Sequence, residues 1–114
     1  MAFKLQFTLT ARDQLNALEK AHSDKLNKIR RTLGFLETNP RHPSLNTHKY
    51  DGYAGPSGEQ IFEAYVENRT PGAYRVFFFY PAPPKPQSTA KGVKVPQPTQ
   101  HISTIVVAAI TPHP

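Results

Sequence analysis

The chain has 114 residues, a length typical of a single domain with a modest hydrophobic core. It carries 14 lysines and arginines against 8 acidic residues, and the formal net charge of +6 favours an acidic partner such as nucleic acid or an acidic protein. The absence of cysteine excludes disulfides and thiolate chemistry, and no apolar run is long enough for a membrane helix or a secretory signal. We therefore expect one cytoplasmic domain over residues 1–114 that works away from membranes.

The amino-terminal third predicts a strand followed by two helices. Phe3 to Thr8 alternates apolar and polar residues, which is typical of a strand with one face in the core. Thr10 is expected to cap the first helix, and Ser23-Asp24 to separate it from the second. The second helix is expected to end at Asn39-Pro40, because a residue before proline avoids the helical region. The two helices should form an antiparallel hairpin across one face of a sheet.

The segment from Arg41 to Pro56 predicts an irregular loop, because it contains two prolines, two glycines and many polar residues. It also carries His48 and Lys49 just before the next predicted strand. A polar and basic loop in this place indicates a binding edge beside the sheet.

A β-hairpin is predicted from Gln60 to Tyr80, with the turn at Pro71-Gly72. Alternation along its first strand places Glu63, Tyr65 and Glu67 together on the less apolar face. Arg75 shares that face in one of two possible registers, because a slip of one residue reverses every side chain. In the register that places Arg75 there, Phe77 and Phe79 lie on the same face.

The last third combines an unusual insertion with a buried strand. Residues 81–99 hold six of the chain's 12 prolines and three lysines, which predicts an extended loop insertion. Ile102 to Ile110 is almost continuously apolar and β-branched, which predicts a central strand buried on both faces. The predicted fold is therefore α+β, with a two-helix hairpin packed on one face of a small, mainly antiparallel sheet.

Four segments carry a family resemblance through their order and spacing. They are FKLQFTLTARDQLNAL at the start, RRTLGFLETNPRHPSLNTHKYDG after the second helix begins, IFEAYVENRTPGAYRVFFFY in the hairpin and TIVVAAITPHP at the end. Together they resemble the RelE/ParE superfamily of toxins from bacterial type II toxin–antitoxin systems. The resemblance implies a strand, a helical hairpin and three or four antiparallel strands. The proline-rich insertion at 81–99 departs from the short turn that is usual in the family.

The resemblance also implies a function. RelE-like members are endoribonucleases that enter the ribosomal A site and cut messenger RNA, whereas ParE-like members poison DNA gyrase. Each toxin is silenced by a cognate antitoxin, expected here to be a separate, smaller and acidic chain. Our leading hypothesis is a ribosome-dependent messenger RNA endoribonuclease that inhibits translation. The alternative is a non-catalytic member of the same fold, either a gyrase poison or a degenerate antitoxin-binding domain.

Three residues fall where the nuclease members place catalytic groups. Cleavage of RNA without a metal needs a base for the ribose 2′-OH, positive charge at the phosphate and an acid for the leaving 5′-oxygen. The resemblance implies Glu63 as the base, Arg75 as the phosphate clamp and His113 as the acid. His48 and Lys49 occupy a stretch where other members place a histidine or lysines, so either could act as the base or hold phosphate.

Aromatic residues of the hairpin are candidates for stacking on RNA bases. Tyr65, Phe77 and Tyr80 complete the expected substrate-binding set. Because side chains alternate along a strand, at least one of the three consecutive phenylalanines must face the core. We expect no cofactor and no metal site, since the remaining histidines show no ligand spacing: His22, His42 and His101.

Overall fold

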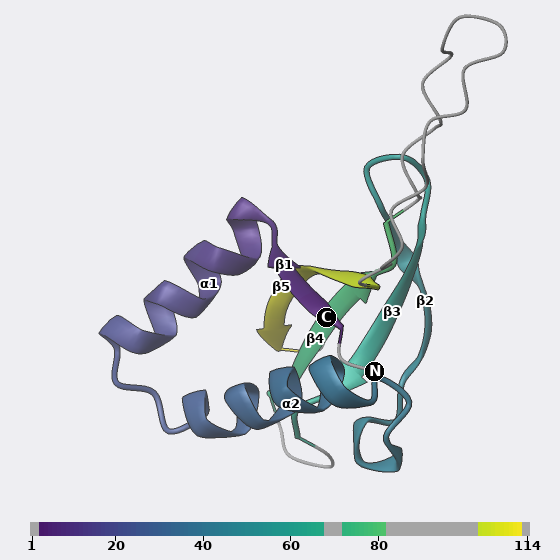
Figure 1. Cartoon of the computed structure of the whole chain (residues 1–114). Coiled ribbons are helices and arrows are strands. Elements are labelled where there is room, and N and C mark those ends of the chain that lie inside the picture. Colours follow the sequence, from purple (N-terminus) through teal and green to yellow (C-terminus); the bar gives the residue numbers. More distant parts are fainter. Residues whose placement is uncertain (1–2, 68–71, 82–102, 113–114) are drawn as a thin grey trace, which may run out of the picture.

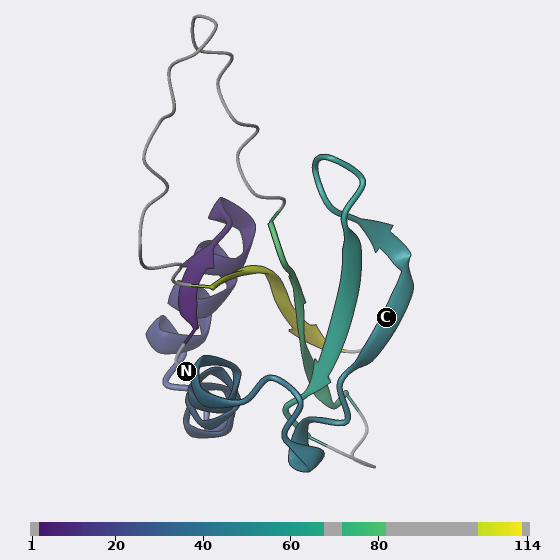
Figure 2. The same ribbon diagram turned by 45° about the vertical axis from the view of Figure 1, so that its right-hand side comes forward.

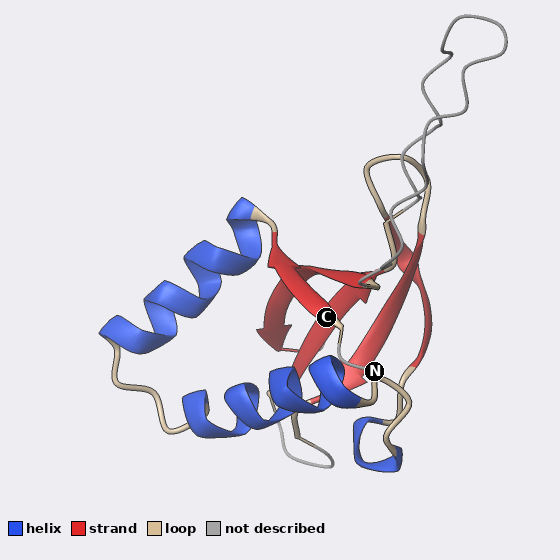
Figure 3. Ribbon diagram, in the orientation of Figure 1, coloured by secondary structure: helices blue, strands red, loops and turns tan. Residues whose placement is uncertain are grey.

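The computed structural model describes residues 3–67, 72–81 and 103–112. Over these residues the chain forms a five-stranded sheet with both helices on one of its faces (Figures 1 and 3). The helices are α1 (Leu9–Lys20) and α2 (Leu26–Thr38), a short 3₁₀ turn η1 covers Pro43–Leu45, and the strands are β1 (Lys4–Phe7), β2 (His48–Ala54), β3 (Gln60–Tyr65), β4 (Tyr74–Phe79) and β5 (Thr104–Pro112). Apart from Pro81, the predicted insertion at 81–99 lies outside the described residues.

The last strand lies inside the sheet, as its apolar sequence predicts. The strand order is β1-β5-β4-β3-β2, so β5 pairs with β1 on one side and with β4 on the other (Figure 2). The β1–β5 pair is parallel and all other described pairs are antiparallel, which confirms the predicted α+β fold with a mainly antiparallel sheet.

One core fills the space between the helices and the sheet. We call this side of the sheet the helix-side face; on the hairpin it is formed by Phe62, Ala64, Val76 and Phe78. The buried residues packed there also include four from the helices and η1 and three from β5: Ile29, Leu33, Leu36, Leu45, Ile105, Val107 and Ile110. No helix in the described part of the chain is long and apolar enough to cross a membrane.

A bulge in β5 explains how Val107 and Ile110 both reach this core although they are three residues apart. The register with β4 shifts between Phe77 and Phe78, so that Ala108 stands outside the regular pairing. The start of α1 satisfies the backbone groups around the bulge: Thr8 Oγ1 donates to the Ala108 carbonyl at 2.8 Å, and the Ile110 amide donates to Gln14 Oε1 at 2.7 Å. The helix therefore fixes the irregular part of the central strand.

Replacing Gln14 with alanine should lower the free energy of unfolding by about 1–2 kcal/mol, because the Ile110 amide would lose its acceptor in a partly buried place. Urea denaturation measures this loss. Asn16→Ala on the exposed side of the same helix is the matched control and should not lower stability, because alanine favours a helix. An equal loss in both variants would show that the contact with the Ile110 amide is not the cause.

The first helix begins two residues earlier than the sequence predicts. Its N-cap is Thr8, whose hydroxyl accepts the Ala11 amide at 3.1 Å, and Thr10 is already inside the helix. Both threonines are suitable caps, and the contact between Thr8 and Ala108 selects the first of them. The prediction of Thr10 as the cap was therefore wrong.

The segment predicted as an irregular loop contains a strand. β2 runs along the outer edge of β3, with His48 opposite Glu63 and Tyr50 opposite Ile61. The prediction was wrong because an edge strand exposes one side to water and so tolerates polar residues and glycine. Its register shifts between Tyr50 and Ala54, and at Gly52 an added Cβ would lie 2.5 Å from the Tyr50 ring.

The second face of the sheet, which we call the outer face, is partly covered. On the hairpin it is formed by Ile61, Glu63, Tyr65, Arg75, Phe77 and Phe79. The rings of Tyr50 and Tyr53 from β2 lie edge-on to Phe77, with centroids 4.9 and 5.3 Å away. As a result Phe77 is fully buried, and less of the outer face is exposed to solvent than strand alternation alone predicts.

Candidate active site

The hairpin register places Arg75 on the same face as Glu63. In the β3–β4 pair, Tyr65 stands opposite Arg75 and Glu63 stands opposite Phe77. Opposite residues of an antiparallel pair point to the same side of the sheet. Arg75 therefore lies on the outer face with Glu63 and Tyr65, a choice that the sequence alone could not make. β2 adds His48 to this group, because it pairs with Glu63 from the other side.

A histidine and a buried glutamate form the centre of this group. His48 Nε2 lies 2.7 Å from Glu63 Oε1. The Glu63 side chain is 1% exposed, whereas the His48 side chain is 45% exposed. The carboxylate is therefore reached from solvent through the imidazole rather than directly.

The second nitrogen of His48 fixes the protonation of the ring. Nδ1 lies 2.7 Å from the carbonyl oxygen of Asn46, which is held in the left-handed conformation with φ 47°. A carbonyl oxygen only accepts hydrogen bonds, so Nδ1 carries a proton. Nε2 lies within hydrogen-bond distance of the Glu63 carboxyl group, so one proton can be shared between the two groups. His48 and Glu63 therefore form a proton-sharing pair.

Arg75 lies next to this pair and is held by three other groups. Its Nε lies 3.9 Å from Glu63 Oε2, and the residue is 7% exposed. Its Nη1 donates to the carbonyl oxygens of Glu67 and Tyr74. The guanidinium carbon lies 3.7 Å from the centre of the Tyr65 ring, a cation–π arrangement. Arg75 is the only buried lysine or arginine among the described residues.

The structure brings together only some of the predicted substrate-binding residues. Tyr65 belongs to the group, because its ring stacks on Arg75 and meets the His48 ring edge-on, with centroids 5.6 Å apart. Phe77 lies beneath the β2 tyrosines, so it offers no free face for stacking. His113 lies outside the described residues.

Lys49 and Tyr80 lie away from the histidine–glutamate pair. Lys49 stands opposite Phe62, and the Tyr80 ring packs against Phe62 and Phe78, so both belong to the helix-side face. Tyr80 lines a groove of about 420 Å³ there, together with Arg41 and His42. Neighbours in a strand point to opposite faces, which separates Lys49 from His48.

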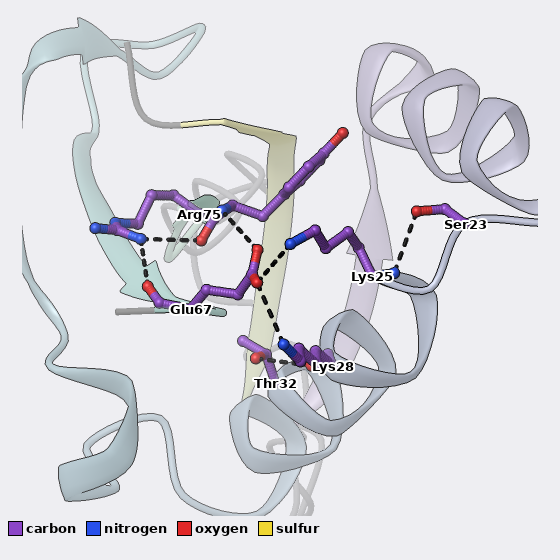
Figure 4. Close-up of polar contacts among 7 residues, drawn as sticks. Ser23, Lys25, Lys28, Thr32, Glu67 and Arg75 are labelled. Carbon is purple, nitrogen blue, oxygen red and sulfur yellow. Dashed lines mark hydrogen bonds and ion pairs between the residues drawn. The ribbon is translucent and has the colours of Figure 1, made fainter. Parts of the chain in front are cut away.

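Glu67 does not share the outer face with Glu63, contrary to the prediction. The amides of Val66 and Glu67 both approach the Tyr74 carbonyl, at 3.1 and 3.4 Å, so alternation ends there. The Glu67 side chain instead meets α2, where its carboxylate accepts hydrogen bonds from Lys25 at 2.7 Å and Lys28 at 3.3 Å (Figure 4).

The hydrogen bond from Lys25 holds the pKa of Glu67 below its ordinary value of 4.5. A carboxyl group with a depressed pKa in the folded state stabilises the protein above its unfolded pKa, and this contribution is lost as pH falls through the folded value. Stability measured by urea denaturation should therefore fall between pH 5 and pH 3 more steeply in the wild type than in Glu67→Gln. The exposed Glu19→Gln variant is the control and should keep the wild-type slope.

Sequence reasoning missed two contributors to the site. Asn46 directs His48 through a backbone carbonyl, which no side-chain pattern reveals. Lys25 contacts Glu67, which lies 42 residues further along the chain. This contact depends on how α2 packs against the sheet, and the sequence pattern does not reveal that packing. Among the described residues, no group of three or more histidine and acidic side chains could hold a metal ion.

Comparison with known proteins supports the fold. No family model matches the sequence, and no curated protein sequence matches it. Among solved structures the chain matches the crystal structure of YafQ from Escherichia coli strain BL21(DE3), with a TM-score of 0.56 and 12% sequence identity. The match covers 96% of this chain and 92% of YafQ. The chain therefore has the RelE-like fold that its sequence resemblance implied.

Proposed function

We propose that this chain is the toxin of a type II toxin–antitoxin system and that it cleaves messenger RNA on the ribosome. The observation that carries the proposal is the outer-face group in which Glu63 contacts His48 at 2.7 Å and Arg75 at 3.9 Å. The fold supports the same class, because YafQ is a RelE-family toxin. The charge of +6 suits both an RNA substrate and an acidic antitoxin in the cytoplasm.

Burial reverses the simplest assignment of the base. Glu63 is covered, so we assign direct contact with the ribose to His48 and give Glu63 the role of orienting its ring. In the proposed complex the 2′-OH replaces the Asn46 carbonyl at Nδ1, after the resting Nδ1 proton has left to water. Nδ1 then accepts the hydroxyl proton, while the Glu63 carboxylate balances the charge of the imidazolium.

The remaining steps need positive charge and an acid. As the 2′-oxygen attacks, negative charge grows on the phosphate, and the Arg75 guanidinium beside the pair stabilises it. The 5′-oxygen leaves with a proton from His113 in this proposal, and a 2′,3′-cyclic phosphate remains. Tyr65 lines the same place and is suited to stack on a base next to the scissile bond. The scheme uses no metal and no cofactor.

Induction of the chain in bacterial cells tests the proposal against its alternative. Wild-type protein should stop translation and growth, and His48→Gln should not, at equal protein levels. Asp51→Asn, at an exposed position of the same strand, is the matched control and should still arrest growth. DNA damage and filamentation with continued translation would overturn the nuclease proposal in favour of a gyrase poison.

A further inference from the structure

Glu67 connects the second helix to the candidate active site through two different parts of the same residue. Its carboxylate, whose side chain is 4% exposed, is bound by Lys25, the N-cap residue of α2, and by Lys28 in the first turn of that helix (Figure 4). Its backbone carbonyl accepts a hydrogen bond from Arg75 Nη1. The bulge at Val66 and Glu67 turns the Glu67 side chain toward the helix, while its carbonyl still faces Arg75.

The position of Arg75 depends on this carbonyl. The guanidinium contacts the Tyr65 ring on one side, and its Nη1 is directed by the carbonyls of Glu67 and Tyr74. Tyr74 also donates its amide to Glu67 Oε1 at 3.4 Å, so both carbonyls belong to the segment that the Glu67 carboxylate anchors. A shift of Glu67 would therefore move both acceptors of Arg75 together.

The anchor is strong because the carboxylate is buried. An exposed ion pair contributes little to stability, but a buried carboxylate that loses its cation must move toward water or take up a proton. Lys25 is the main partner, since its Nζ is closer than that of Lys28 and its side chain is 28% exposed against 59%. Without Lys25, the segment around Glu67 would rearrange.

We infer that Glu67, held by Lys25, is a positioning residue that sets the guanidinium of Arg75 for catalysis. The inference rests on the proposed function for its catalytic part, but the geometric part stands without it. Displacement of a catalytic group by about 1 Å can cost on the order of 100-fold in rate, so the expected effect of a partial shift is about tenfold.

The geometric part is tested by NMR of ¹⁵N-labelled protein, through the arginine Nε–H signals. The Arg75 signal, identified by its loss in Arg75→Lys, should be displaced upfield by the Tyr65 ring in the wild type. Lys25→Met and Glu67→Gln should return it toward the position of an exposed arginine. Lys28→Met, which removes the longer and more exposed contact, should cause a smaller shift.

The matched control breaks an ion pair on the surface. Arg30→Met removes the exposed contact with Glu19, at 3.6 Å, and should leave the Arg75 signal in place. An unchanged Arg75 signal in both Lys25→Met and Glu67→Gln, with each protein folded by circular dichroism, would overturn the inference. If Glu67→Gln does not fold, Lys25→Met alone decides the test.

The catalytic part is tested by a double-mutant cycle on RNA cleavage. Glu67→Gln should lower kcat about tenfold with little change in KM when Arg75 is present. It should have no further effect in the Arg75→Ala background, because a positioning residue acts only through the group it positions. Equal effects in both backgrounds would contradict the inference. Absence of cleavage by wild-type protein would instead contradict the proposed function, and the NMR result would still decide the geometry.

Discussion

Glu63→Gln is expected to lower kcat for RNA cleavage by about 100-fold or more, because the proposed base His48 loses the carboxylate that orients its ring. Glutamine keeps the size of the side chain but cannot balance the charge of a protonated His48. His48→Gln should cause a loss of similar size, because it removes the exposed member of the same pair. Steady-state cleavage of a messenger RNA in a translation reaction measures both.

The double variant distinguishes a working pair from two independent groups. If His48 and Glu63 act as one unit, Glu63→Gln combined with His48→Gln should be no slower than the slower single variant. Asp51→Asn, which changes an exposed acid on the same strand as His48, is the control and should keep the wild-type rate. Losses that multiply in the double variant, or a Glu63→Gln enzyme with full activity, would contradict the proton-sharing pair.

Arg75→Met should lower the free energy of unfolding by about 3–5 kcal/mol, the range for removing one partner of a buried ion pair. Two causes add: the Glu63 carboxylate loses its nearest buried cation, and the carbonyls of Glu67 and Tyr74 lose the hydrogen bonds that Arg75 donates to them. Urea denaturation at neutral pH measures the loss. Arg30→Met, at an exposed ion pair, should change stability by less than about 1 kcal/mol.

A second substitution separates the two causes. Adding Glu63→Gln to Arg75→Met removes the buried negative charge and should recover part of the lost stability, because no buried carboxylate then faces the place of the lost guanidinium. The lost carbonyl contacts would not recover. If the double variant were less stable than Arg75→Met, charge balance would not explain the role of Arg75 in the fold.

The sheet could be predicted from the sequence where burial dictates the pattern. The apolar run from Ile102 to Ile110 predicted a central strand, and β5 does lie between β1 and β4. Alternation in the hairpin predicted that the consecutive phenylalanines divide between the faces, and Phe78 does face the helices while Phe77 faces outward. In both cases several residues of the element are buried, so the apolar pattern is repeated along the strand and does not depend on any single contact.

Prediction failed where single contacts decide the structure. β2 exposes one edge, so its sequence carries little apolar signal, and only pairing with β3 identifies it. Thr8 and Thr10 are equal candidates for a cap until β5 supplies the acceptor for Thr8. Glu67 leaves the alternation at a bulge, which depends on the local pairing with Tyr74 and not on residue type.

The candidate site shows the same division. Alternation grouped Glu63 with Tyr65, and the register added Arg75. The contact between His48 and Glu63 required β2, so the sequence could name both residues without pairing them. Lys49 was grouped with them by family position and Tyr80 as an aromatic residue suited to stacking, yet strand geometry turns both to the helix-side face. The role of His113 stays a prediction.

The most direct test of the proposed function is cleavage of messenger RNA in a reconstituted translation reaction, with wild-type protein beside Glu63→Gln, His48→Gln and Asp51→Asn. The wild type and Asp51→Asn should cut the messenger only when ribosomes are present and leave a 2′,3′-cyclic phosphate. The Glu63 and His48 variants, folded by circular dichroism, should cut it about 100-fold more slowly or not at all. Intact messenger after incubation with folded wild-type protein, or equal cutting by all four, would contradict the account.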